Sequence, residues 1–284
     1  MLLYHYTNTA GLLGILKSQT LWASDAEYLN DAEELKYGRR EMLDALRAEE
    51  KRILANGGTI EGSAEGSRAS ILSSAVHSLE TGTSSYQGPY VVCFCSEWDL
   101  LSQWRGYAEG HGWALGFDAD ELAACATSWD KSESALQEIT YGPSGIANAA
   151  QRAAQMTAPN PVSHPGVYGD YMAHVVCRRE LARIKHPAFA EEKEWRLIVD
   201  QDGSVANTLN EDHAGCGRAS TLEFRDGTTG LTPYLPVPWP YSALRELVIG
   251  PTQYRDEQRS AVDRLLGTTG RPEFPIRISR APFR

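Results

Sequence analysis

The sequence has no Cys-x-x-Cys motif, although it contains five cysteines. An odd number of scattered cysteines favours neither a zinc ribbon nor a disulfide framework. Cys93 and Cys95 stand at strand spacing in an apolar run, which predicts small core residues. A reducing cytoplasm is therefore the expected location.

Long apolar segments and an excess of positive charge are also missing. The N-terminus has no basic stretch followed by an apolar one, so no signal peptide is expected. The uncharged run from Gly227 to Leu244 contains four prolines and cannot form a spanning helix. With 27 Lys and Arg against 37 Asp and Glu, the net charge is −10, which argues against bulk attraction to nucleic acid.

One segment reverses this acidic balance. From Arg245 to Arg284 there are eight arginines and five acidic residues. This local excess can guide a nucleic-acid substrate, or it can be an ordinary solvated face.

The usual enzyme motifs are absent as well. The sequence contains no G-x-G-x-x-G, no P-loop, no H-E-x-x-H and no G-x-S-x-G. His111 and His174 have no partner at metal-ligand spacing, so we expect no metal site.

Hydrophobic residues make up 42% of the chain and charged residues 23%, which is typical of a folded protein. Short apolar runs alternate irregularly with amphipathic segments, which predicts the α+β class in a single domain over residues 1–284. The segment 56–67 is rich in Gly, Ser and Glu and is expected to be a mobile loop. Core positions are predicted on the strands, at Val92, Phe94, Trp113, Phe117, Leu197 and Val199.

Three places depart from an ordinary structural pattern. His5 places a polar ring inside an aromatic strand. It is either a functional residue or an ordinary strand-edge residue that is exposed to water. The segment 102–107 places large aromatic residues around Arg105. Glu194 stands where a charged run enters an apolar strand, so its carboxylate is expected to be partly desolvated, whereas Glu191 and Glu192 are expected to be solvated.

The block LYHYTNTAGLLGILKSQTLWAS resembles the opening of a large bacterial family catalogued only as a domain of unknown function. The blocks LSQWRGYAEGHGWALGFD, EKEWRLIV, ELVIGPTQY and SRAPFR extend this resemblance over most of the chain. A recurring block of that family begins at Asn30, which is a candidate for the site. Asp31, with Glu34 three residues later, is better interpreted as a capping box.

A histidine-threonine strand, a Leu/Ile-spaced helix and a short strand together resemble the start of ADP-ribosyltransferases. The resemblance implies a split, mostly antiparallel sheet, with NAD as substrate. It implies that His5 holds the NAD ribose, beside Tyr6 and Thr7, and that Glu194 acts in catalysis on a neighbouring strand facing the same cleft. The aromatic residue that stacks on nicotinamide is left open among Trp22, Tyr28, Trp104 and Tyr107.

The residue types suit that chemistry. A carboxylate near the ribose stabilises the positive charge that develops as nicotinamide departs. Arg105 or Arg196 can meet the pyrophosphate, because a planar guanidinium suits two oxygens.

The function implied is transfer of ADP-ribose to a macromolecule, with nucleic acid as one candidate acceptor. The implied setting is a bacterial toxin or antiphage defence, where an antitoxin is a candidate partner. The alternatives are NAD hydrolysis, nucleotide-phosphate chemistry on a similar cleft, and a non-catalytic module that senses a nucleotide.

Overall fold

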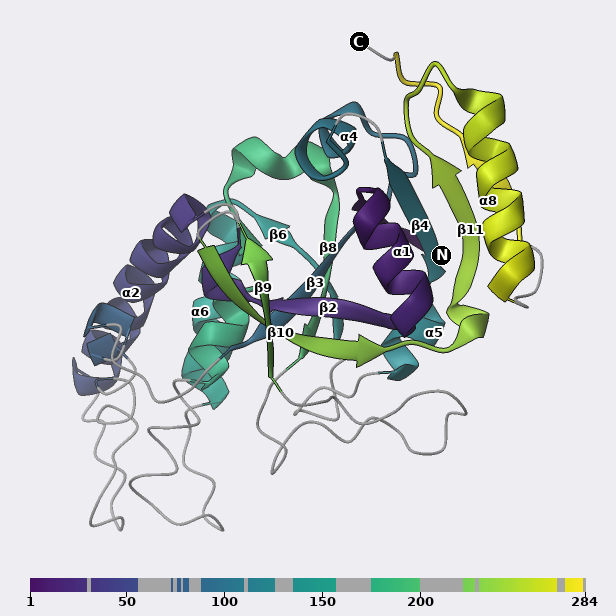
Figure 1. Ribbon diagram of the computed structural model, residues 1–284. Coiled ribbons are helices and arrows are strands. Elements are labelled where there is room, and N and C mark those ends of the chain that lie inside the picture. The colour runs from purple at the N-terminus through teal and green to yellow at the C-terminus, as the bar shows by residue number, and fades with distance from the viewer. Residues whose placement is uncertain are drawn as a thin grey trace.

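A computed structural model describes most of the chain (Figure 1). The described residues are 1–29, 32–55, 88–109, 112–125, 135–156, 175–199, 222–227, 230–269 and 274–282, with a few helical positions between 73 and 81. The expected loop at 56–67 lies outside these residues, as do Asn30, Asp31, His111 and His174.

Ten strands form one open, mostly antiparallel sheet, in agreement with the sequence prediction of a mixed, largely antiparallel fold. Only β11 and β12 pair in parallel within it. The strands are β1 (Leu2–Thr7), β2 (Thr20–Asp25), β3 (Tyr90–Cys95), β4 (Trp113–Asp118), β5 (Leu136–Glu138), β8 (Glu194–Val199), β9 (Glu223–Gly227), β10 (Gly230–Pro238), β11 (Leu244–Ile249) and β12 (Ile276–Ile278).

The sheet branches at β3. Along one edge, β3 pairs with β8 over its whole length. Along the other edge, β2 pairs with Tyr90 and Val91, whereas β1 pairs with Cys95. We call the point between Val91 and Cys95, where β1 and β2 separate, the sheet split. The middle of β3 is therefore open to side chains on that edge.

Strand β10 was not predicted from the sequence, because it contains three prolines. Residues 230–234 pair with β9 and residues 234–238 pair with β2, on the opposite edge. Within the described ranges, each half of the strand therefore has one unpaired edge, toward which a proline nitrogen can point without interrupting a ladder. The segment 136–141 contains two strands, because β5 joins the main sheet while β6 (Thr140–Tyr141) pairs with β7 (Ile184–Lys185).

Helices cover both faces of the sheet (Figure 1). On one face α1 (Thr9–Ser18), α5 (Ala119–Cys125) and α8 (Arg255–Thr269) enclose the main core. All six core positions predicted from the sequence are buried there. On the other face, α4 (Leu101–Tyr107) packs on β1. A second hydrophobic cluster is formed by three helices, which are α2 (Ala32–Ala55), α6 (Pro143–Met156) and a helix at 175–181.

Three short 3-10 turns complete the described elements. They are η1 (Ala26–Tyr28), η2 (Pro187–Glu192) and η3 (Tyr241–Ala243). In the described part of the chain, no helix carries an apolar stretch long enough to cross a bilayer.

The start of α1 is fixed by Asn8, whose Oδ1 accepts a hydrogen bond from the Gly11 N–H at 2.9 Å. Asn8→Ala is expected to lower the free energy of unfolding by about 1 kcal/mol, because the N–H loses its acceptor. Asn8→Ser should retain most of that stability, since serine caps about as well. Chemical denaturation of the three proteins measures this. Equal losses in both variants would mean that the cap is not what Asn8 contributes.

Candidate functional site

His5 lies at the sheet split. Its Nδ1–H donates a hydrogen bond to the carbonyl oxygen of Cys93 at 2.9 Å, and its ring meets Phe94 edge-on at 5.9 Å. The separation of β1 and β2 leaves this carbonyl open to a side chain, and the histidine ring fills the position.

Burial determines the protonation state of His5, and the hydrogen bond to Cys93 determines its tautomer. Burial lowers the pKa of His5 below its ordinary value of 6.5, and the charge of Arg225 lowers it further, against the effect of the Cys93 carbonyl. The ring is therefore neutral at pH 7, with its proton on Nδ1. Nε2 is then a hydrogen-bond acceptor, and it has no hydrogen-bond partner among the described residues.

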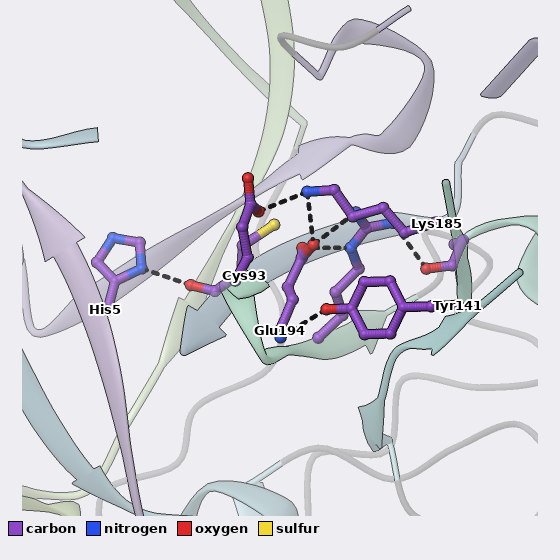
Figure 2. A network of polar contacts seen from close by, with 8 residues as sticks. His5, Cys93, Tyr141, Lys185 and Glu194 are labelled. Carbon is purple, nitrogen blue, oxygen red and sulfur yellow. Dashed lines mark hydrogen bonds and ion pairs between the residues drawn. The ribbon is translucent and has the colours of Figure 1, made fainter. Parts of the chain in front are cut away.

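Glu194 begins β8 and belongs to a buried group of charges (Figure 2). Its Oε1 accepts from Arg196 Nε at 2.6 Å, and its Oε2 accepts from Arg196 Nη2 at 3.1 Å and from Lys185 Nζ at 2.9 Å. Lys185 also donates to Glu192 at 2.6 Å. We call Lys185, Glu192, Glu194 and Arg196 the ion cluster, in which two positive charges balance two negative ones.

The ion cluster keeps Glu194 ionised although only 4% of its surface is exposed. Burial alone would raise the pKa of Glu194, but Arg196, Lys185 and a hydrogen bond from the Cys93 thiol outweigh it and lower the pKa to about 2. Burial and the charge of Glu194 raise the pKa of Cys93, so this thiol stays protonated and acts as a donor.

Two tyrosines border the ion cluster. The hydroxyl of Tyr141, on β6, accepts from the backbone N–H of Glu194 at 2.9 Å, and burial raises its pKa to about 12. Tyr107, on α4, exposes 41% of its surface. Burial of its hydroxyl end nevertheless raises its pKa, and Lys185 and Glu194 are among the groups that act on it.

His5 and Glu194 were expected on neighbouring strands facing one cleft. The structure instead puts β3 between them, with Tyr4 opposite Cys95 on one side and Glu194 opposite Cys95 on the other. Strand alternation directs His5 away from Tyr4 and toward the core face of Leu115, its partner on β4. Cys93 lies between His5 and Glu194 in Figure 2 and binds both of them, since its carbonyl accepts from His5 and its thiol donates to Glu194.

Glu192 was expected to be solvated, and this is wrong. Its side chain is 13% exposed and accepts from Lys185. The turn η2 brings Glu192 back over β7, where the buried ammonium attracts a second carboxylate. Glu191 is exposed, as expected.

The other predicted site residues divide into buried and exposed ones. Trp104 is 0% exposed and its Nε1 donates to Asp99, so it is a core residue and offers no stacking surface. Tyr6 is buried and donates to the Glu97 carbonyl. Arg196 is engaged by Glu194 and the Ala182 carbonyl, which leaves it poorly placed for a pyrophosphate. Thr7 is half-buried, whereas Trp22, Tyr28, Arg105 and Tyr107 are exposed.

Several residues of this region were not identified from the sequence. They are Ser24, Cys93 as a thiol donor, Tyr141, Lys185 and Arg225. Lys185 and Tyr141 stand on two-residue strands that have no hydrophobic period to reveal them.

Comparison with known proteins bears on the same region. Residues 103–197 match the model of a family described as a protein of unknown function (DUF2971). The match covers about a third of the chain, from α4 to β8, and includes Tyr107, Tyr141, Lys185, Glu194 and Arg196. Neither a curated protein nor a solved structure matches the chain. Similarity to an uncharacterised family is thus confirmed for this stretch.

The depressed pKa of Glu194 predicts a loss of stability in acid. Its folded-state pKa of about 2 lies below the ordinary 4.5, so its contribution is complete above pH 5 and disappears as the pH falls toward 2. The difference corresponds to about 3 kcal/mol. Denaturation at pH 6, 5, 4 and 3 should show this decline, and it should be shallower in Glu194→Gln. If the free energy of unfolding fell equally steeply with pH in the two proteins, the low pKa of Glu194 would be contradicted.

Proposed function

We propose that this chain is an NAD-dependent ADP-ribosyltransferase that acts on a macromolecule at the sheet split. The observation that carries the proposal is Glu194, a carboxylate that stays ionised in a desolvated environment near the exposed Tyr107. His5 Nε2 is available to accept from a ribose hydroxyl, and Glu194 supplies negative charge in a desolvated environment.

In the proposed reaction, the bond between the ribose C1′ and the nicotinamide nitrogen breaks, and nicotinamide leaves with the bonding electrons. Positive charge builds on the ribose, and a carboxylate nearby stabilises it. An oxygen or nitrogen of the acceptor forms the new bond to C1′ and releases its proton to water.

The position of Lys185 makes Glu194 available for this role. Lys185 Nζ lies between two carboxylates, 2.6 Å from Glu192 and 2.9 Å from Glu194. The ammonium can therefore remain paired with Glu192 while the Oε2 of Glu194 accepts a hydrogen bond from a ribose hydroxyl. Arg196 continues to hold Oε1 and keeps the carboxylate ionised.

Exposed aromatic rings lie on two of the elements around the split. Trp22 on β2 is 45% exposed, and Tyr107 on α4 is 41% exposed with its hydroxyl near the ion cluster. Either ring is suited to stack on nicotinamide. DNA and RNA are the first acceptors to test, in the toxin or antiphage setting suggested by the resemblance.

One observation favours a second candidate, a nucleotide-sensing module. Both oxygens of Glu194 are already bound and the side chain is almost fully buried, which is also what a structural ion pair requires. Such a module would bind NAD at the split and leave it intact.

Labelled NAD distinguishes these functions. The parent protein is incubated with NAD labelled in its ADP-ribose part, together with protein, DNA or RNA. Label on a macromolecule supports the transferase, and free ADP-ribose indicates hydrolysis. Intact NAD with saturable binding supports the sensor, and the absence of both binding and turnover rejects the proposal.

A further inference from the structure

Arg225 on β9 reaches across β10 toward the sheet split. It lies opposite Thr232 of β10, yet its Nη2 donates to the hydroxyl of Ser24 on β2 at 2.9 Å. Its Nη1 donates to the Asp226 carbonyl at 3.3 Å. Because β10 lies between β9 and β2, the guanidinium must extend over β10 to make the contact with Ser24.

The guanidinium of Arg225 is incompletely paired. Two of its five N–H groups donate to an acceptor in the described part of the chain, and its buried Nε–H has no acceptor there. It forms no salt bridge with the described residues, whereas Arg152, Arg178 and Arg196 each pair with a carboxylate. A buried N–H without an acceptor is unfavourable, and a bound oxyanion would satisfy it.

The surroundings of Arg225 fit a nucleotide. Ser24 lies opposite Val91, at the border of the sheet split, and the charge of Arg225 acts on His5. The rings of Trp22 and Tyr234 lie 4.7 Å apart on the same part of the sheet. The nearby carboxylate of Glu223 opposes an anion by its charge, but it is engaged by the Tyr234 hydroxyl, which donates to it at 2.6 Å.

We propose that Arg225, assisted by the hydroxyl of Ser24, binds the pyrophosphate of the nucleotide. The identity of that nucleotide as NAD rests on the proposed function, but the affinity for a diphosphate does not. A guanidinium offers parallel N–H groups that match two oxygens of a phosphate. Arg196 and Arg105 were the arginines expected in this role. Arg225 replaces both of them in the proposal, because Arg196 is paired with Glu194.

The test measures binding of inorganic pyrophosphate and ADP by calorimetry. The parent should bind both, and Arg225→Gln should weaken both at least tenfold. Arg225→Lys keeps the charge but loses the planar fork, so its affinity should fall between the two. Arg245→Gln removes a half-exposed arginine on β11 and should bind within twofold of the parent.

The pKa of His5, followed by NMR, tests the same subsite even if a variant is less stable than the parent. NMR titration of His5 should show that pyrophosphate raises the His5 pKa in the parent, because the anion offsets the charge of Arg225. Arg225→Gln should raise the same pKa without ligand and abolish the further shift. The subsite is rejected if Arg225→Gln binds pyrophosphate and ADP as the parent does, or if the parent binds neither. Pyrophosphate binding that depends on Arg225, in a parent that leaves NAD intact, would reject the transferase and support the subsite.

Discussion

Glu194→Gln is expected to lower NAD turnover by roughly 10²–10³-fold, because it removes the negative charge that faces the developing positive charge on the ribose. The change preserves the shape of the side chain. His5→Ala should instead weaken NAD binding and turnover together, since its contact with the ribose exists before and during the reaction. Turnover at saturating NAD, with NAD affinity measured separately, distinguishes these outcomes.

The matched control is Glu191→Gln. Glu191 is an exposed carboxylate three residues before Glu194, in the same charged run. Its loss should change turnover by less than twofold. Turnover by Glu194→Gln at the rate of the parent would remove Glu194 from the chemistry, whatever the control does.

Arg196→Met is expected to lower the free energy of unfolding by about 3–5 kcal/mol, because it breaks a buried ion pair and leaves Glu194 with Lys185 alone. Arg196 is only 3% exposed, so water cannot replace the lost partner. Chemical denaturation at pH 7 measures the loss. A change under 1 kcal/mol would mean that the ion pair contributes little to folding.

The double variant Glu194→Gln/Arg196→Met separates stability from chemistry. It removes one charge of each sign, so most of the stability lost in Arg196→Met should return. Turnover should nevertheless stay as low as in Glu194→Gln. If turnover also returned, the role of Glu194 would be to neutralise Arg196.

The parts of this fold that were predictable have a regular hydrophobic pattern. The alternating apolar residues of β3, β4 and β8 identified the central strands and all six proposed core positions. The entry of a charged run into β8 predicted a partly desolvated carboxylate at Glu194, which the structure buries more fully, at 4% exposure. These signals are local, so one strand and its neighbours in the sequence are enough to produce them.

The remainder depends on contacts between distant segments. Lys185 reaches Glu194 because β7 pairs with β6, and neither strand is long enough to show a period. Arg225 was missed together with β10, because three prolines conceal a strand that changes partners at Tyr234. The separation of His5 from Glu194 by β3 depends on strand order, which the order of residues in the sequence does not determine.

The prolines of β10 also affect whether the edges of this strand can pair with a strand of another molecule. Among the residues that the structure describes, each half of β10 has a neighbouring strand on one edge only, and an open edge is normally a template for a strand of another molecule. Pro233 stands in the half that pairs with β9, and Pro236 and Pro238 stand in the half that pairs with β2. Because proline has no N–H, an incoming strand would find missing donors along both open edges. The same residues that concealed the strand in the sequence therefore protect the sheet against aggregation by edge pairing.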